Sequence, residues 1–205
     1  MPILCLVTDD DSFRDIDNLK KTITSAVQGG VNLLIIRTNL HSLEYINHFI
    51  YSLKWDLEIE IPIAINLGDL KKIDSDADVL HLPEYSTLNE NDYSQIVGRS
   101  VHSLKSAVEA ESRGADYLIA GTVYKTDSHP YKNPEGVSLI KSITSNVNIP
   151  VFAIGGMKPE NIIPVLESGA SGISTISSVL SSDDPRKTAE KFHKILTENY
   201  NRGTS

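Results

Sequence analysis

The sequence of 205 residues predicts an α/β protein with the fold of a single-domain (β/α)8 TIM barrel, and three observations lead to this prediction. Short apolar runs rich in β-branched residues recur eight times. They are mainly apolar and show no apolar–polar alternation, which is typical of strands buried on both faces of a parallel sheet. Stretches with helical spacing separate most of the runs, and several end in a glycine turn before the next run. Repeated strand and helix units of this kind build a barrel.

The expected strands are continuous apolar segments. In chain order they occupy residues 3–7, 31–37, 61–66, 78–82, 96–100, 116–120, 149–155 and 172–177. Helical spacing follows the first, second and fifth of them, at Leu19, Ile23, Ala26 and Val27, at Leu43, Ile46, Ile50 and Leu53, and at Leu104, Ala107 and Val108. Glycine ends three helices, in AVQGGVNLL, AESRGADYL and LESGASGIS, because it adopts the left-handed cap at little steric cost.

An open doubly wound sheet is the alternative fold. The G-x-G-x-x-G fingerprint expected after its first strand is absent. Barrels typically need about 250 residues, but minimal loops allow a shorter chain. No linker or shift in composition interrupts the sequence, so we expect residues 1–205 to form one domain with a polar tail from about residue 199.

Composition narrows the partners to small molecules. The formal net charge of −8 argues against binding nucleic acid through a general basic field. The single cysteine, Cys5, lies in an apolar run, so we expect a small buried residue without a disulfide or a metal cluster. The acidic N-terminus does not resemble a signal peptide, and no apolar run approaches the ~18 residues of a membrane span. We therefore expect a cytoplasmic protein without a membrane partner.

The functional end of a (β/α)8 barrel is formed by the carboxyl ends of its strands. Here these ends and the loops after them carry Thr8, Asp9, Asp10, Arg37, Asn66, His81, Glu84, Arg99, Ser100, His102, residues 121–129, Gly155, Gly156, Ser177 and Ser178. His81, inside VLHLP, is expected to be a buried core histidine.

A phosphate site is predicted after the last two strands. Gly155 and Gly156 follow a strand directly, and their backbone N–H groups are accessible because no side chain covers them. Ile176 and Ser177 stand at the corresponding point of the next unit, where a helix N-terminus adds partial positive charge. Since barrels commonly bind phosphate at this place, a small phosphate ester is the expected ligand.

Seven segments in order resemble the thiamine phosphate synthase and TenI superfamily of thiamin biosynthesis. They are LCLVTDD, GGVNLLIIR, IPIAIN, VGRSVHSLKSAVEAESRGADYLIAGTVYKTDSHP, GVSLIKSI, IPVFAIGGMKPENI and ESGASGISTISSVLSSDDP. The resemblance covers nearly the whole chain. It implies a (β/α)8 barrel, often a dimer, that handles the thiazole phosphate half of thiamin.

Within the superfamily, a synthase joins the thiazole phosphate to a pyrimidine pyrophosphate and neutralises the departing pyrophosphate with Mg²⁺, Arg and Lys. Compared with its Gln-x-Arg-x-Lys phrase, this chain keeps Arg37 but has Ile35 and Asn39. Leu67 and Ser86 stand where the resemblance places two metal-binding aspartates. His129 replaces the lysine of the sixth loop.

The thiazole phosphate half resembles the family more closely. Thr126, Asp127 and Ser128 approximate its Thr-x-Thr segment, and Gly156, Ile176 and Ser177 align with its phosphate cradle. Asn66, kept after the third strand, belongs to the Asn-Asp phrase of the synthase half. The chain therefore resembles the TenI branch, which tautomerises a carboxythiazole phosphate by proton transfer. We predict a metal-independent thiazole tautomerase, an isomerase without a cofactor, that works as a homodimer.

A tautomerase needs a residue that transfers the proton, and this chain lacks the one that the TenI pattern provides. The TenI pattern has a histidine where this chain has Thr122, and a threonine hydroxyl is a poor base. His129 on the same loop is the first replacement candidate and His102 the second, because imidazole titrates near pH ~6.5. Arg37 is expected to grip the ligand's carboxylate, although it can alternatively pair with Asp9.

The full set of predicted site residues follows. The catalytic candidates are His129, His102 and Thr122, and the substrate-binding residues are Arg37, Asn66, Ser100, Thr126, Asp127, Ser128, Gly155, Gly156, Ile176 and Ser177. Two alternatives stay open. A divergent thiamine phosphate synthase would recruit Glu84 or Asp69 to hold Mg²⁺. A non-catalytic regulator would bind thiazole or thiamin phosphate without turnover, and Thr122 is its main support.

Overall fold

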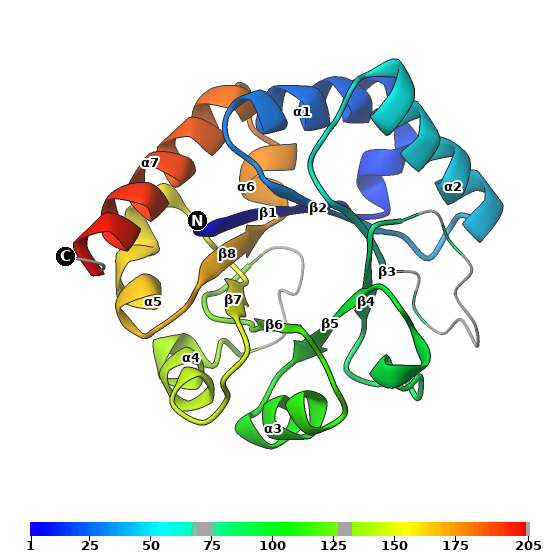
Figure 1. The fold of residues 1–205 in the computed structure, drawn as a ribbon. Coiled ribbons are helices and arrows are strands. Elements are labelled where there is room, and N and C mark those ends of the chain that lie inside the picture. The colour runs from blue at the N-terminus through cyan, green and yellow to red at the C-terminus, as the bar shows by residue number, and fades with distance from the viewer. Residues whose placement is uncertain (67, 69–74, 76, 127–132, 204–205) are drawn as a thin grey trace.

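The computed structural model describes residues 1–66, 68, 75, 77–126 and 133–203, which form a closed barrel of eight parallel strands in sequential order (Figure 1). This confirms the predicted (β/α)8 fold. The strands are β1 Ile3–Val7, β2 Leu33–Arg37, β3 Ile63–Asn66, β4 Val79–Leu82, β5 Ile96–Val101, β6 Tyr117–Ala120, β7 Val151–Ile154 and β8 Gly172–Thr175. Every expected strand is present. Most are shorter than their apolar runs, because pairing begins only where neighbouring strands come into register.

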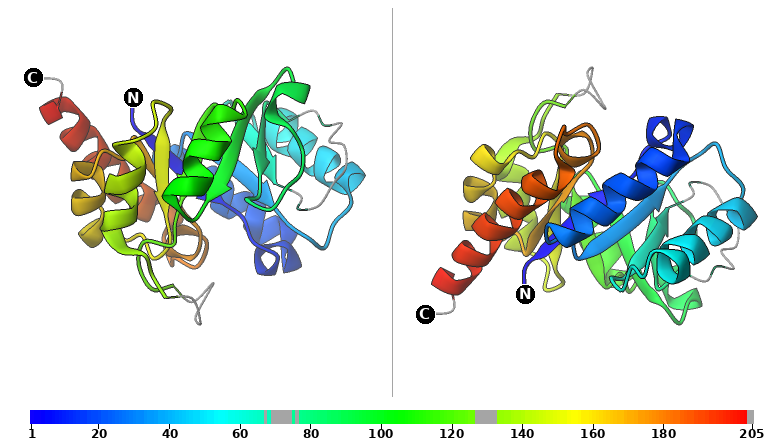
Figure 2. Two further views of the ribbon diagram at one scale, coloured as in Figure 1. Left: turned by 90° about the horizontal axis from the view of Figure 1, so that it is seen from below. Right: turned by 90° about the horizontal axis from the view of Figure 1, so that it is seen from above.

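Helices surround the barrel on its outside (Figures 1 and 2). They are α1 Ile16–Gln28, α2 Leu43–Tyr51, α3 Leu104–Ser112, α4 Gly136–Thr144, α5 Ile163–Glu167, α6 Ser177–Leu180 and α7 Pro185–Gly203. The described residues also form three short 3₁₀ helices, η1 Asp11–Arg14, η3 Glu90–Asp92 and η4 Pro159–Asn161, and one π-helical turn, η2 Ser52–Asp56. Between β4 and β5 only the three-residue η3 occurs, because the polar segment there has no helical spacing of apolar residues.

The buried apolar residues form two clusters. The larger lies between the barrel and its helices and includes Leu4, Leu34 and Phe192. The smaller includes Cys5 and Phe152 and takes the alternate positions of the strands, so it fills the barrel interior. Cys5 is fully buried, as predicted, and burial raises the pKa of its thiol to about 12.

The C-terminal segment, whose last residues from about 199 are polar, is helical as far as Gly203. Helix α7 continues through residue 199 to Gly203 and lies beside α1 (Figure 2). Its apolar face, with Ala189, Phe192 and Leu196, is buried against the rest of the molecule, and no glycine or proline interrupts it before Gly203. A helix anchored in this way extends to the first residue that favours a helix end. None of the helices in the described residues is long and apolar enough to cross a bilayer.

Candidate functional site

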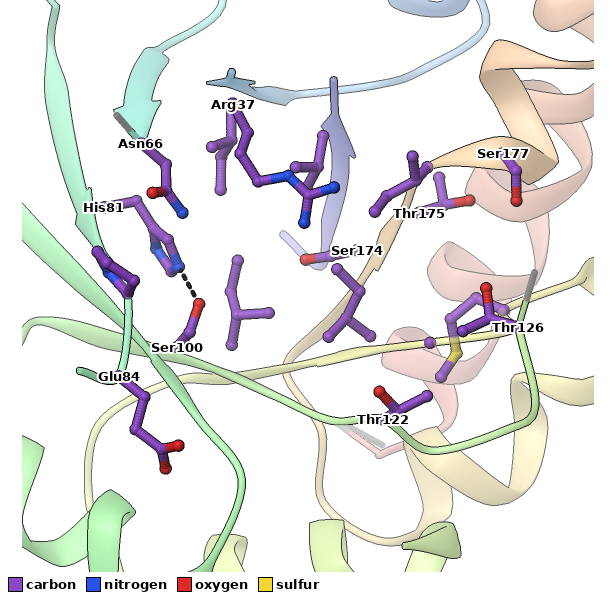
Figure 3. A pocket seen from close by; sticks show the side chains of 18 of the residues that line it. Arg37, Asn66, His81, Glu84, Ser100, Thr122, Thr126, Ser174, Thr175 and Ser177 are labelled. Atoms are coloured by element: carbon purple, nitrogen blue, oxygen red, sulfur yellow. Dashed lines mark hydrogen bonds between the residues drawn. The ribbon is translucent and has the colours of Figure 1, made fainter. Parts of the chain in front are cut away.

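A cavity of about 510 Å³ opens at the carboxyl ends of the strands (Figure 3). All eight strand ends or the loops after them contribute to its wall. Ten of the predicted site residues line it, namely Arg37, Asn66, Ser100, His102, Thr122, Thr126, Gly155, Gly156, Ile176 and Ser177. The other three, Asp127, Ser128 and His129, lie outside the described residues. The structure thus gathers into one cavity residues from β2 to β8 that are far apart in sequence.

The glycine turn after β7 has a backbone that only glycine adopts easily. Gly155 and Gly156 have φ values of 104° and 64°, in the left-handed region. A Cβ on Gly155 would lie 2.4 Å from Thr122 Cγ2, and one on Gly156 would lie 2.5 Å from the Lys125 carbonyl oxygen. Both glycines are therefore required for the close approach of the loop after β6.

Hydrogen bonds hold this turn in place. The Gly155 carbonyl accepts from Tyr124 N at 3.0 Å, and the Gly156 carbonyl accepts from Asn161 Nδ2 at 2.9 Å. Ser178 Oγ donates to the Met157 carbonyl at 2.5 Å, which ties the turn to the loop after β8. A turn fixed in this way presents backbone groups to a ligand without further ordering.

The helix beyond Ser177 contributes less charge than the sequence indicated. Helix α6 is only four residues long, Ser177–Leu180, so few peptide dipoles add along its axis. Val179 N and Leu180 N already donate to the Ile176 carbonyl at 3.1 and 2.9 Å, so what the helix offers a phosphate is the N–H groups at its start, Ser177 and Ser178. Hydrogen bonds, and not a helix macrodipole, are therefore the main attraction for an anion at this end of the cavity.

Arg37 ends β2 with its guanidinium in the cavity (Figure 3). Thr8 Oγ1 accepts from Arg37 N at 2.9 Å and donates to the Arg37 carbonyl at 3.1 Å, which locks the ends of β1 and β2 together. Arg37 forms no ion pair among the described residues. Asp9, its possible partner, instead accepts from Ser12 N at 2.9 Å. Arg37 is thus available to an anionic group of a ligand.

Asp10 lies beside Arg37 and supports the same loop. Its Oδ1 accepts from Thr38 Oγ1 at 2.7 Å and from Asn39 N at 2.8 Å. Partial burial acts to raise the pKa of Asp10, but these hydrogen bonds and the charge of Arg37 outweigh it and hold the pKa below its usual value. Asp10 therefore serves as a charged anchor for residues 38–39.

His102 stands after β5 at the cavity rim. Its Nδ1 contacts the Gly121 carbonyl oxygen, and a carbonyl only accepts, so Nδ1 carries the proton. In the neutral ring Nε2 is then unprotonated and able to accept a proton. Thr122, the residue after Gly121, is buried, and its carbonyl accepts from Glu135 N at 2.8 Å. Of the three catalytic candidates, His102 is the described residue with acid-base chemistry.

His81 is buried, as predicted, but it also borders the cavity (Figure 3). Its Nδ1 lies 3.2 Å from the Tyr117 hydroxyl and its Nε2 lies 2.9 Å from Ser100 Oγ. Desolvation, with the charges of Arg99 and Arg37 adding to it, lowers the pKa of His81 to about 3, so the ring is neutral. The sequence did not indicate this contact, because it joins side chains from three different strands.

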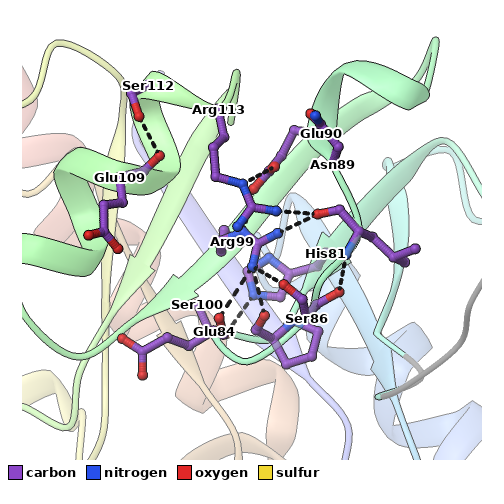
Figure 4. A network of polar contacts seen from close by, with 12 residues as sticks. His81, Glu84, Ser86, Asn89, Glu90, Arg99, Ser100, Glu109, Ser112 and Arg113 are labelled. Carbon is purple, nitrogen blue, oxygen red and sulfur yellow. Dashed lines mark hydrogen bonds and ion pairs between the residues drawn. The ribbon is translucent and has the colours of Figure 1, made fainter.

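Arg99 was expected at the rim, and this expectation is wrong. Side chains alternate along a strand, so Ser100 faces the cavity while Arg99 faces outward into the loop after β4. There it contacts Glu90 and donates to the carbonyls of Pro83, Glu84, Ser86 and Leu88 at 3.0–3.3 Å (Figure 4). Arg113 Nε lies 3.3 Å from the other oxygen of Glu90. This buried network shapes the loop that carries Glu84 and Tyr85 to the cavity wall.

No metal-binding group of three or more His, Cys, Asp or Glu side chains occurs in the part of the chain that the structure describes. Ser86, at one metal position of the resemblance, does not line the cavity; its hydroxyl accepts from Leu88 N at 3.3 Å. Leu67, at the other position, and Asp69 lie outside the described residues.

The fold and the cavity define a (β/α)8-barrel protein with a small-molecule site at the carboxyl end of its strands. Residues 4–179 match the family model described as "Thiamine monophosphate synthase". The chain belongs to this family, which confirms the predicted superfamily but does not single out its TenI branch.

Individual relatives agree with this assignment. The chain is 32% identical to "Thiamine-phosphate synthase" of Clostridium acetobutylicum, over 96% of this chain and 95% of the relative. It is 35% identical to the protein of the same name from Desulfitobacterium hafniense, over 82% and 85% of the two chains. The solved structure of thiamine phosphate pyrophosphorylase from Pyrococcus furiosus superposes with a TM-score of 0.79 at 29% identity, covering 96% of each chain.

Proposed function

We propose that this chain is a cytoplasmic enzyme of thiamin biosynthesis that binds a thiazole phosphate in the cavity and joins it to a pyrimidine pyrophosphate. The observation that carries the proposal is the match to relatives named thiamine-phosphate synthase along nearly the whole chain. Transferase chemistry thereby takes precedence over the isomerase that the sequence motifs favoured.

The ligand's phosphate lies at the glycine turn in this proposal. Gly155, Gly156 and Ser177 provide backbone groups there, and the left-handed turn keeps side chains away from them. Ile119, Ile154 and Ile176 form an apolar wall that suits an aromatic ring. The opposite side, with Arg37, Asn39 and Asn66, offers a cation and amide groups to the second substrate.

The family resemblance implies Mg²⁺, and the described residues do not fit a resident Mg²⁺ site. Mg²⁺ is usually held by one or two carboxylates together with substrate phosphates. Both oxygens of Asp10 are within 3.5 Å of donors on Thr38 and Asn39, and Glu84 Oε1 accepts from His102 N at 3.0 Å. We therefore assign stabilisation of the leaving pyrophosphate to Arg37 and the neighbouring amides.

Tautomerisation of a carboxythiazole phosphate is the second candidate function, and His102 favours it. His102 lines the cavity, and the contact of its Nδ1 with the Gly121 carbonyl leaves Nε2 as the nitrogen that can accept a proton, which supports a reaction that needs proton transfer without a metal. In this reading Arg37 holds the ligand's carboxylate and His102 replaces the family histidine lost at Thr122. His129, the other replacement candidate, lies outside the described residues.

One incubation distinguishes the two reactions. Purified protein is mixed with carboxythiazole phosphate in deuterated buffer, with and without the pyrimidine pyrophosphate and Mg²⁺, and products are followed by mass spectrometry and ultraviolet absorbance. When both substrates are present we expect thiamin phosphate to accumulate, with the ring carboxylate leaving as CO2 and the pyrophosphate group leaving as inorganic pyrophosphate. Accelerated aromatisation with deuterium incorporation and no condensation would replace the first function by the second. Tight binding without either product would leave a non-catalytic binding protein.

A variant tests the role of His102 in proton transfer. His102→Ala is expected to slow aromatisation by about 10²–10⁴-fold, the usual contribution of a general acid-base residue. His48→Ala is the matched control, because exposed His48 also contacts a carbonyl through Nδ1, 2.9 Å from Glu44 O, and lies on α2 away from the cavity. Equal rates for the two variants would remove His102 from the mechanism.

A homodimer and a single domain over residues 1–205 also remain proposals. Light scattering coupled to size exclusion would show a mass near twice the 22.5 kDa of one chain if the dimer forms.

A further inference from the structure

Three neighbouring strands bring Tyr117, His81 and Ser100 into one hydrogen-bonded line. In the sheet register His81 of β4 pairs with Gly98 of β5, and Gly98 pairs with Tyr117 of β6. A Cβ on Gly98 would lie 2.0 Å from the Tyr117 ring. Because Gly98 has no side chain, the ring crosses β5 and its hydroxyl reaches His81 Nδ1 at 3.2 Å. His81 Nε2 then contacts Ser100 Oγ at 2.9 Å (Figure 3).

Burial determines which atoms carry the protons in this line. Tyr117 is 5% exposed and His81 is 2% exposed, and His81 Nδ1 is the hydrogen-bond partner of the Tyr117 hydroxyl among the described residues. If Nδ1 carried the ring proton, the phenolic proton would be buried without an acceptor, at a cost of about 1–3 kcal/mol. The alternative arrangement satisfies both groups. Tyr117 donates to Nδ1, and Nε2–H donates to Ser100 Oγ.

This proton arrangement fixes the hydrogen-bond role of Ser100, which borders the cavity. Its oxygen accepts from His81, so its own proton is left for a partner on the cavity side. A ligand or a water molecule can accept a hydrogen bond from this hydroxyl because Ser100 is only partly buried. A serine hydroxyl can either donate or accept a hydrogen bond. The contacts of Tyr117 and His81 therefore leave Ser100 as a hydrogen-bond donor toward the cavity.

We propose that Tyr117 and His81 are positioning residues that fix Ser100 as a hydrogen-bond donor to the ligand, so that the cavity selects a ligand with an acceptor atom at this point. Acceptors of the right kind are a carboxylate or phosphate oxygen or an unprotonated ring nitrogen, whereas an amino group there is disfavoured. The inference rests on the cavity being the ligand site, as proposed above, but not on which of the two reactions takes place.

Nitrogen NMR of the histidine side chains tests the tautomer without any ligand. Long-range ¹H–¹⁵N spectra of uniformly labelled protein report which ring nitrogen carries the proton, and a His81→Gln variant assigns the His81 signals. We expect the proton on Nε2 in the wild type and a mixed or reversed tautomer in Tyr117→Phe. A proton on Nδ1 in the wild type would overturn the proposal.

Binding tests the consequence for the ligand. With the thiazole phosphate as probe in calorimetry, Tyr117→Phe and Ser100→Ala are each expected to weaken affinity by about 2–10-fold, the effect of one neutral hydrogen bond. The double variant should lose no more than Ser100→Ala alone, because the residues act in series. Tyr45→Phe, at an exposed position of α2, is the control. A loss with Ser100→Ala but none with Tyr117→Phe contradicts the positioning role, whereas failure of the wild type to bind contradicts the proposed function and leaves the NMR result intact.

Discussion

Replacing Arg99 with methionine is expected to lower the free energy of unfolding by about 3–5 kcal/mol, the usual cost of removing one partner of a buried ion pair. Glu90 has a fully buried carboxylate, and Arg99 is 3% exposed. The substitution leaves Glu90 with Arg113 alone and removes donors from four loop carbonyls. Denaturant unfolding followed by circular dichroism measures the change.

A second variant separates the ion pair from packing. Arg99→Met combined with Glu90→Leu removes both charges, and apolar replacement of a whole buried pair is often neutral or stabilising. We expect the double variant to be more stable than Arg99→Met, although the carbonyls of Glu84 and Ser86 still lack the guanidinium donor. The Pro83 and Leu88 carbonyls keep Ser86 N and Arg113 Nη2 as donors. If the free energy of unfolding of Arg99→Met lay within about 1 kcal/mol of the wild-type value, water would replace the guanidinium and the network would not hold the loop.

Replacing Gly156 with alanine is expected to abolish measurable binding of the thiazole phosphate. The left-handed backbone at φ 64° adds strain of about 1–2 kcal/mol for a residue with a Cβ. The new Cβ also meets the Lys125 carbonyl at 2.5 Å and Tyr124 Cβ at 2.8 Å, so the loop after β6 must move. Since Thr122 and Thr126 of that loop line the cavity, the displacement alters the site. Calorimetry gives the affinity and thermal unfolding gives the stability.

Gly136→Ala is the matched control for this substitution. Gly136 also has a left-handed backbone, at φ 74°, but a Cβ there would have only Ser138 Oγ nearby, at 3.7 Å. It does not line the cavity. This variant should lose stability through strain alone and keep its affinity. Equal affinities for Gly136→Ala and Gly156→Ala would show that the turn after β7 does not bind the phosphate.

The strands of this barrel could be predicted from sequence because their signal is local. A continuous apolar run such as residues 3–7 is typical of a strand buried on both faces, and all eight runs became strands. The glycine turn after β7 could also be predicted, because two glycines directly after a barrel strand indicate a tight turn where barrels commonly bind phosphate. Helix α6 was predicted less well, because apolar spacing does not reveal that a helix stops after one turn.

The side-chain networks could not be predicted from the sequence because they depend on the register in which the strands pair. Strand alternation alone would have placed Arg99 and Ser100 on opposite faces, and this signal was missed. The contact from Tyr117 to His81 requires the pairing of three strands and the gap at Gly98. Likewise, the motif departures at Leu67 and Ser86 favoured an isomerase, whereas similarity along the whole chain favours the synthase.

Calorimetric titration of the wild type with the thiazole phosphate and with its dephosphorylated alcohol shows whether the cavity binds this ligand by its phosphate. Hydrogen bonds to a charged group contribute about 1.5–3 kcal/mol each, so the account predicts that the phosphate ester binds at least about tenfold more tightly. Equal affinity for the two compounds, or binding of neither, would contradict it.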